Sequence, residues 1–176
     1  MGHFVAIKML PLAAVSSSDE AVAELACIFA AAHHLPVPSD KILRDGKPRF
    51  ERGPHFSVSH SGDWWVCAVS GGPVGIDLQQ HRRCRADAVA RRFYHPDERR
   101  WLAEQPPAAF FNIWAAKEAY VKYTGEGITG LFSAFSTVDG EGSVRACNGT
   151  YLYPLSAPEG YSLCLCAAGD AEIEFI

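Results

Sequence analysis

Two carboxylates, one amide and several basic residues of this chain have the types and spacing to hold a metal ion beside a phosphate group. Asp77 and Gln79 stand two residues apart in the run Val-Gly-Ile-Asp-Leu-Gln, whose alternation predicts a strand at residues 74–79. Residues i and i+2 of a strand share one face and lie about 6.5–7 Å apart. Both side chains can therefore approach one ion or its water shell.

A second carboxylate, that of Glu118, lies in a segment at residues 110–127 that predicts a helix ending at a Gly-x-Gly. On a helical wheel Lys117 falls in the middle of the apolar stripe, whereas Glu118 and Lys122 lie at its edge, one turn apart. A lysine on an apolar stripe needs an anion or a cleft to face, because burying an unpaired ammonium costs free energy. An ordinary interpretation also stands: a surface ion pair, with Lys117 reaching solvent from the edge of the core.

Taken together, these residues predict chemistry on a phosphate. Asp77, Gln79 and Glu118 offer the hard oxygen donors that Mg²⁺ prefers. The groups that can donate to phosphate oxygens are Lys47, His60, Lys117 and Lys122. A metal and lysines around a phosphate are the usual arrangement for transferring a phosphoryl-type group, since that chemistry consists mostly of positioning and charge stabilisation.

The composition limits the class of protein. The chain has 176 residues, 48% of them hydrophobic, which is enough for the core of one domain or of two small halves. The net charge of −4 and the lack of a basic surplus argue against a nucleic-acid partner. One group of basic residues is either a solvated face or a patch for an acidic partner: Arg82, Arg83, Arg85, Arg91 and Arg92.

The cysteines and the hydrophobic runs predict a cytoplasmic protein without a membrane partner. The six cysteines form no Cys-x-x-Cys pair and no metal-finger spacing, which is typical of reduced core residues. The apolar run at residues 9–15 is short and interrupted by proline, unlike a signal peptide. No stretch reaches the ~18 apolar residues that a membrane span needs.

The order of elements predicts an α+β fold of two similar halves, residues 1–73 and 74–176, joined at a glycine-rich turn. We expect strands at residues 4–10, 56–60, 64–70, 74–79, 132–138, 143–147, 162–168 and 172–175. We expect helices at residues 20–33, 86–93, 96–104 and 110–127.

Four motifs together resemble the signature blocks of 4′-phosphopantetheinyl transferases of the longer, surfactin-synthetase-activator type. They are FSVSHSG at residues 56–62, PVGIDLQ at 73–79, WAAKEAYVK at 114–122 and GEG at 125–127. The resemblance extends in the same order over residues 46–138, more than half of the chain. It implies two pseudo-symmetric α+β halves, each a small antiparallel sheet with packed helices, and an active site in the cleft between them. It also implies a monomer.

The resemblance further implies transfer of 4′-phosphopantetheine from coenzyme A to a serine of an apo acyl or peptidyl carrier protein, with release of 3′,5′-ADP. Asp77 and Glu118 would bind Mg²⁺, and Glu118 would also take the proton of the serine hydroxyl. Lys122 would stabilise the breaking pyrophosphate, with Lys117 nearby. The residues that match coenzyme A-binding positions of the family are Lys47, Ser59 and His60.

The chain departs from the family pattern at two places. Gln79 stands where the family often has a glutamate ligand, so we expect weaker metal binding or a water in place of that ligand. The segment before Lys47 is short, and its helix at residues 20–33 is nearly free of basic residues. We therefore expect the 3′-phosphate of coenzyme A to depend on other residues: Lys41, Arg44, Lys47 and His60.

Two other functions stay open at this point. One is a non-catalytic module that binds coenzyme A or a carrier protein, with Gln79 marking a degenerate metal site. The other is a metal-dependent phosphohydrolase acting on a nucleotide, although the chain has no Walker-type glycine-rich loop.

Overall fold

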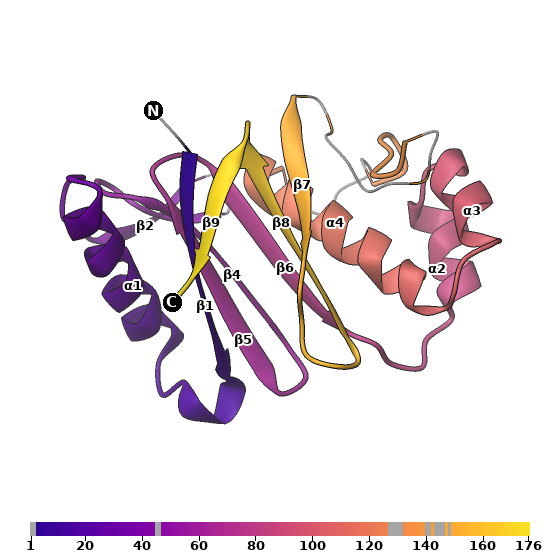
Figure 1. Ribbon diagram of the computed structural model, residues 1–176, viewed down its shortest axis with the longest axis horizontal. Coiled ribbons are helices and arrows are strands. Elements are labelled where there is room, and N and C mark those ends of the chain that lie inside the picture. Colours follow the sequence, from indigo (N-terminus) through magenta and orange to yellow (C-terminus); the bar gives the residue numbers. More distant parts are fainter. Residues whose placement is uncertain (1–2, 45–46, 127–131, 140–141, 143–146, 148) are drawn as a thin grey trace.

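The computed structural model describes residues 3–44, 47–126, 132–139, 142, 147 and 149–176. They form an α+β fold, which confirms the expected class (Figure 1). The helices are α1 (Ser18–Ala32), α2 (Ala86–Phe93), α3 (Pro96–Leu102) and α4 (Ala108–Thr124), and a 3-10 turn covers Leu12–Ala14. The strands are β1 (His3–Pro11), β2 (Lys41–Arg44), β3 (Lys47–Phe50), β4 (His55–Ser61), β5 (Trp64–Ser70), β6 (Val74–Gln80), β7 (Thr150–Leu155), β8 (Tyr161–Ala168) and β9 (Ala171–Phe175).

The strands form two main sheets and one separate hairpin. The first sheet has the order β4-β5-β1-β9, the second has the order β6-β8-β7, and β2 pairs with β3. All pairings are antiparallel except that of β1 with β9, which is parallel. Because β9 follows β8 in the chain but joins the first sheet, the sheets do not divide cleanly between residues 1–73 and 74–176.

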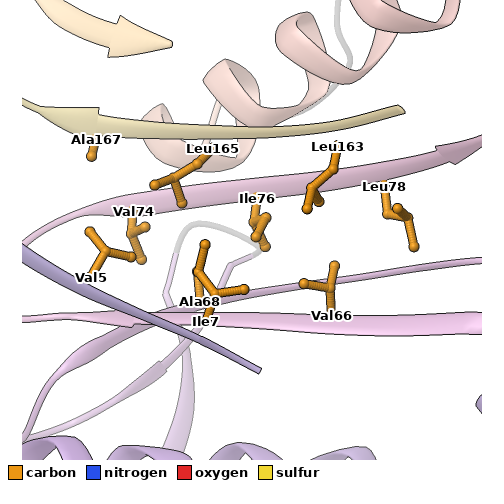
Figure 2. Packing of buried hydrophobic residues seen from close by; sticks show 10 residues of the cluster. All are labelled: Val5, Ile7, Val66, Ala68, Val74, Ile76, Leu78, Leu163, Leu165 and Ala167. Atoms are coloured by element: carbon orange, nitrogen blue, oxygen red, sulfur yellow. The ribbon is translucent and has the colours of Figure 1, made fainter. Parts of the chain in front are cut away.

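The largest core lies between the two sheets (Figure 2). Its members are Val5, Ile7, Val66 and Ala68 from the first sheet, and Val74, Ile76, Leu78, Leu163, Leu165 and Ala167 from the second. On β6 the even-numbered residues Val74, Ile76 and Leu78 are fully buried in this core, as the alternation in the sequence predicts.

Each sheet carries one long helix on its other face (Figure 1). Leu25 and Phe29 of α1 pack against Trp65 and Cys67 of the first sheet. Residues of α4 pack against Cys164 and Cys166 of the second sheet. The layers are therefore α1, first sheet, second sheet and α4. All six cysteines are free, and four of them are buried.

The contact of α4 with β6 depends on Gly75. A Cβ at this position would collide with the backbone carbonyl of Ala119 and with the backbone nitrogen of Tyr123. The absence of a side chain thus lets the helix lie directly on the strand. The helix ends at Gly125, whose positive φ of 82° forms a left-handed cap that its amide closes on Val121.

Alternate serines of β4 connect the two sheets without a backbone ladder. Each Oγ accepts a hydrogen bond of 3.0–3.1 Å from an amide on the facing edge of β6. The pairs are Ser57 with Ile76, Ser59 with Leu78, and Ser61 with Gln80. We call these three bonds the serine seam. They satisfy edge amides that would otherwise be buried without acceptors.

Several expected elements differ from the structure. The strand predicted at residues 132–138 is wrong, because residues 132–135 form turns and a bend, and the carbonyls of Phe132 and Phe135 both accept hydrogen bonds from Lys117. Most of the strand predicted at residues 143–147 lies outside the described residues, although Cys147 forms an isolated bridge with Thr150. Strands β2, β3 and β7 were not predicted. Among the described helices, none is long and apolar enough to cross a membrane.

Candidate active site

Asp77 is the centre of a buried polar network on β6. Its side chain is only 3% exposed. Its Oδ1 accepts hydrogen bonds from Ser59 Oγ at 2.9 Å and from Lys122 Nζ at 2.7 Å. Its Oδ2 accepts one from Gln79 Nε2 at 2.7 Å. These partners fix the orientation of the carboxylate toward α4.

Lys122 connects the helix to both sheets at this point. Besides its ion pair with Asp77, its Nζ donates to the carbonyls of Val58 on β4 and Ile76 on β6, each at 3.2 Å. The ammonium therefore lies where the serine seam meets α4. Its three donors all have acceptors, so its position is well defined.

Glu118 precedes Lys122 by one helical turn and is 8% exposed. Its carboxylate has no hydrogen bond or ion pair with any residue in the described part of the chain. Burial, together with the negative charge of Asp77, raises the pKa of Glu118 to about 7, although Lys122 acts in the opposite direction. Glu118 is thus a carboxyl group that exchanges its proton near neutral pH.

A cavity of about 520 Å³ extends from this cluster to α1 and to the β2–β3 hairpin. Glu118 and Lys122 line it, together with residues of α1, β4 and the hairpin. The charged residues that line it are Asp19, Lys41, Lys47, Glu118, Lys122 and Glu126. Its size and its mixture of apolar wall and charged groups suit a ligand larger than a simple ion.

Lys47 enters this cavity from β3. Its Nζ donates to the carbonyl of Val74 at 3.0 Å and to that of Lys122, the latter in the last turn of α4. Burial lowers the pKa of Lys47 to about 8, and the positive charges of Arg49 and Lys122 act in the same direction. In the structure Lys47 therefore both lines the cavity and caps the end of the helix.

The structure thus brings together Asp77, Gln79, Glu118, Lys122 and Lys47 of the residues that the sequence singled out. Ser59 is close as well, but it is part of the serine seam, and it contacts Asp77 rather than lining the cavity. His60 follows it on β4 with an exposed side chain that does not line the cavity.

Lys117 does not join this cluster. It is fully buried on the other side of α4, where its Nζ lies 3.0 Å from Glu98 Oε2 and donates to the carbonyls of Phe132 and Phe135 at 2.5 and 2.7 Å. Glu98 is fully buried as well. The anion that Lys117 faces is therefore the carboxylate of Glu98 on α3, and not the phosphate group that the sequence suggested.

The donor set of the cluster fits a hard divalent cation. Asp77 and Glu118 are two neighbouring carboxylates, and the negative charge of Asp77 adds to the effect of burial in raising the pKa of Glu118. A cation between them would relieve this repulsion. Gln79 completes the set only with its carbonyl oxygen, because its Nε2 is directed at Asp77. No group of three His, Cys, Asp or Glu suited to a metal occurs among the described residues.

Sequence reasoning missed two groups of residues in and around the site. Ser57 and Ser61, which belong to the seam, could have been found from the sequence, because serine occupies every second position of this strand. The position of Arg49 near the end of α4 has none, because it depends on how the β2–β3 hairpin folds against the helix.

Comparison with known proteins places the chain in a family. Residues 73–166 match the model of the 4′-phosphopantetheinyl transferase superfamily. The chain is 39% identical over 122 residues to the 4′-phosphopantetheinyl transferase psf-1 of Bacillus pumilus, covering 62% of this chain and 52% of that protein. It is 35% identical over 135 residues to a 4′-phosphopantetheinyl transferase of Bacillus subtilis, covering 70% and 60%.

A third relative, the 4′-phosphopantetheinyl transferase gsp of Aneurinibacillus migulanus, is 36% identical over 102 residues, which is 53% of this chain and 43% of that protein. The matches thus span about half of the length of these curated relatives. The matched segment contains β6 and α4, and with them Asp77, Glu118 and Lys122. This chain belongs to the 4′-phosphopantetheinyl transferase superfamily.

Proposed function

We propose that this protein transfers the 4′-phosphopantetheine group of coenzyme A to a serine of an apo acyl or peptidyl carrier protein and releases 3′,5′-ADP. The observation that carries the proposal is that Glu118 and Lys122 line one wall of a large cavity, with Asp77 directly behind them in an ion pair with Lys122. The names of the relatives, all 4′-phosphopantetheinyl transferases, support the same reaction.

In this reaction the serine oxygen of the carrier attacks the phosphorus that bears pantetheine. A new P–O bond forms, the bond from that phosphorus to the bridging oxygen of the pyrophosphate breaks, and 3′,5′-ADP leaves with the electron pair. The serine proton passes to the carboxylate of Glu118. A pKa of about 7 suits this role, because a general base works best when its pKa is near the working pH.

Asp77 and Glu118 would hold Mg²⁺, with Gln79 or a water as a further ligand. Bound Mg²⁺ supplies neutralisation of the charge on the pyrophosphate oxygens. Gln79 contributes an oxygen only if its amide turns round from Asp77. Lys122 holds Asp77 in place through their ion pair, and its positive charge beside the cavity favours the anionic pyrophosphate.

We also propose that the molecule works as a monomer built from two pseudo-symmetric halves, residues 1–73 and 74–176. In support, each half supplies a sheet with a long helix on its outer face. The cavity is lined by α1 and β4 of one half and α4 of the other, which agrees with an active site between the halves. The six free cysteines support a reducing, cytoplasmic environment.

The carrier would dock on the exposed arginines around α2. They are Arg82, Arg83, Arg85, Arg91 and Arg92. Such charges attract an acidic partner and are screened over about 8–10 Å at physiological ionic strength. We therefore expect the transfer rate to fall with added salt, and a rate that does not change with salt would count against this surface.

The decisive experiment incubates the protein with coenzyme A, Mg²⁺ and apo carrier proteins of the fatty-acid, polyketide and peptide-synthetase classes. Mass spectrometry should show the gain of one phosphopantetheine on at least one carrier. Glu118→Gln should abolish the gain while largely keeping coenzyme A binding. If no carrier of any class gains mass, the proposal fails.

One observation favours a second function, a module that binds coenzyme A or a carrier without turnover. The amide nitrogen of Gln79 is hydrogen-bonded to Asp77, so that residue 79 now gives this carboxylate a donor instead of an additional carboxylate for a metal. A Mg²⁺ titration separates the two functions. Binding of coenzyme A that does not depend on metal, with no transfer at any Mg²⁺ concentration, supports the module.

A further inference from the structure

Arg49 of β3 carries a positive charge for which the described residues provide no partner. Its Nε is buried, and it is the one buried side-chain nitrogen or oxygen without a hydrogen-bond partner in the part of the chain that the structure describes. Its guanidinium makes no ion pair there either. A buried donor without an acceptor is unfavourable, the more so when it is charged, and an anionic ligand would supply the missing acceptor.

The surroundings of Arg49 are cationic. Lys47 lies two residues before it on the same strand face, and His55 begins the adjoining strand β4. Burial lowers the pKa of both groups, and the charge of Arg49 lowers each of them further. Arg49 Nη2 and Lys47 Cδ approach a Cβ built on Gly125 to 3.7 and 3.9 Å. The two side chains therefore flank the end of α4, where Gly125 and Lys47 line the cavity.

The other cations at the cavity already have carboxylate or carbonyl partners. Lys41 pairs with Asp19 at 2.7 Å, and Lys122 pairs with Asp77 at 2.7 Å. Lys47 is bonded to two backbone carbonyls. Of these four cations, Arg49 is the one for which the described residues supply no hydrogen-bond or ion-pair partner. A guanidinium is also the side chain best shaped to bind two oxygens of one phosphate.

From this arrangement we infer that Arg49 binds a phosphate group of coenzyme A at the edge of the cavity, next to Lys47. The inference rests on the proposed function and adds a specificity-determining residue to it. It also shifts the recognition of phosphate away from Lys41, which the sequence favours but which is paired with Asp19. The phosphate concerned is either the 3′-phosphate or the pyrophosphate, which share the same chemistry.

The test measures binding by isothermal titration with coenzyme A and with 3′-dephospho-coenzyme A, in the absence of any carrier. For Arg49→Gln we expect the Kd of coenzyme A to rise about tenfold or more, as for the loss of a hydrogen-bonded charge. If only coenzyme A is affected, Arg49 binds the 3′-phosphate; if both compounds are affected equally, it binds the pyrophosphate. Arg52→Gln is the matched control, because Arg52 is exposed and lies off the cavity, and it should leave both Kd values unchanged.

A purely structural role would give a different result. If Arg49→Gln lowers the Tm but leaves both Kd values unchanged, Arg49 only caps α4 and the inference is wrong. If Arg49→Gln does not fold, Arg49→Lys is the second test. It keeps the positive charge but loses the planar guanidinium that can bind two oxygens of one phosphate, so the Kd of coenzyme A should rise several-fold. The binding assay contains no carrier, so it tests the role of Arg49 independently of transfer. If the wild-type protein binds coenzyme A but modifies no carrier in the separate transfer experiment, the proposed function is refuted and the role of Arg49 is still decided.

Discussion

Gly75 and Ala119 are in backbone contact, with the carbonyl of Ala119 placed where a side chain on Gly75 would begin. This contact sets the distance between β6 and α4. Asp77 lies two residues after Gly75 on the strand, and Glu118 and Lys122 flank Ala119 on the helix. The geometry of the charged cluster is therefore determined by a position that has no side chain.

Gly75→Ala should damage both folding and activity. The added methyl has to push α4 off β6, and overpacking of this kind costs about 1–3 kcal/mol. Glu118 and Lys122 move with the helix, so transfer should fall by more than the folded fraction does. Gly71→Ala is the control, since the added carbon meets only one side-chain atom, Leu35 Cδ1, at 3.7 Å. Stability is measured by urea unfolding and activity by the transfer rate. If both variants lose equal stability and activity, the contact of Gly75 with Ala119 does not set the geometry of the site.

Glu118→Gln should make the protein more stable at high pH while removing transfer. The folded pKa of about 7 exceeds the ordinary value of 4.5, so between these values the folded chain holds a proton that the unfolded chain releases. Stability therefore falls as pH rises through this window, and the cost is fully present above it. Without Mg²⁺ we expect a gain of about 1–2 kcal/mol at pH 8, allowing for partial solvation. The gain should vanish near pH 4, and a constant difference across pH would contradict the raised pKa.

Ser59→Ala tests whether Ser59 contacts the ligand or only holds the protein together. In the structure Ser59 Oγ accepts from Leu78 and donates to Asp77. Its loss should cost about 1–3 kcal/mol, because it leaves the buried amide of Leu78 without an acceptor and removes one of the three donors to Asp77. Ser61→Ala removes a single seam bond at a less buried site and should cost less. A higher Kd for coenzyme A in Ser59→Ala at unchanged stability would instead support direct contact.

Lys117→Met should destabilise the fold and leave coenzyme A affinity unchanged. Glu98 would stay buried, with its bonds to Thr137 and the amide of His95 but without its cation, which costs about 3–5 kcal/mol. The double change with Glu98→Gln should cost less than Lys117→Met alone, which denaturant unfolding can measure. Weaker coenzyme A binding at unchanged stability would instead indicate that Lys117 contacts a phosphate group of coenzyme A.

Gln79→Glu should strengthen the response to Mg²⁺. The change adds a carboxylate beside Asp77 and Glu118 and removes the amide nitrogen that now donates to Asp77. We expect half-maximal transfer at a lower Mg²⁺ concentration and, without metal, a less stable protein because three like charges meet. An unchanged Mg²⁺ dependence would show that residue 79 does not face the metal.

The periodicity of apolar residues along the sequence was sufficient to predict which side chains of β6 and α4 are buried. The alternation of residues 74–79 correctly placed Val74, Ile76 and Leu78 in the core, and the helical wheel correctly put Lys117 among buried residues. The partners of Lys117 were beyond reach, since Glu98 lies nineteen residues earlier and the two carbonyls belong to turns that resemble a strand in sequence. Apolar alternation there reflects packing around an ammonium instead of a sheet.

The site shows the same division. Asp77, Glu118 and Lys122 were identified by residue type and motif, and the structure places Asp77 and Lys122 in an ion pair. Arg49 could not be found in this way, because its importance is the lack of a partner in three dimensions. The pairing of Lys41 with Asp19, twenty-two positions apart, likewise follows only from how the hairpin folds back on α1.

The parallel pairing of β1 with β9 has a consequence for synthesis on the ribosome. β1 is the first described strand to be synthesised and β9 the last. The edge of β1 that pairs with β9 therefore stays unpaired until all the other described strands have been synthesised. During that interval its unpaired amides and carbonyls are open to strands of other nascent chains. A chain that stops before Ala171 would keep this edge exposed permanently, and such truncated products should aggregate even though β6, α4 and the charged cluster are complete.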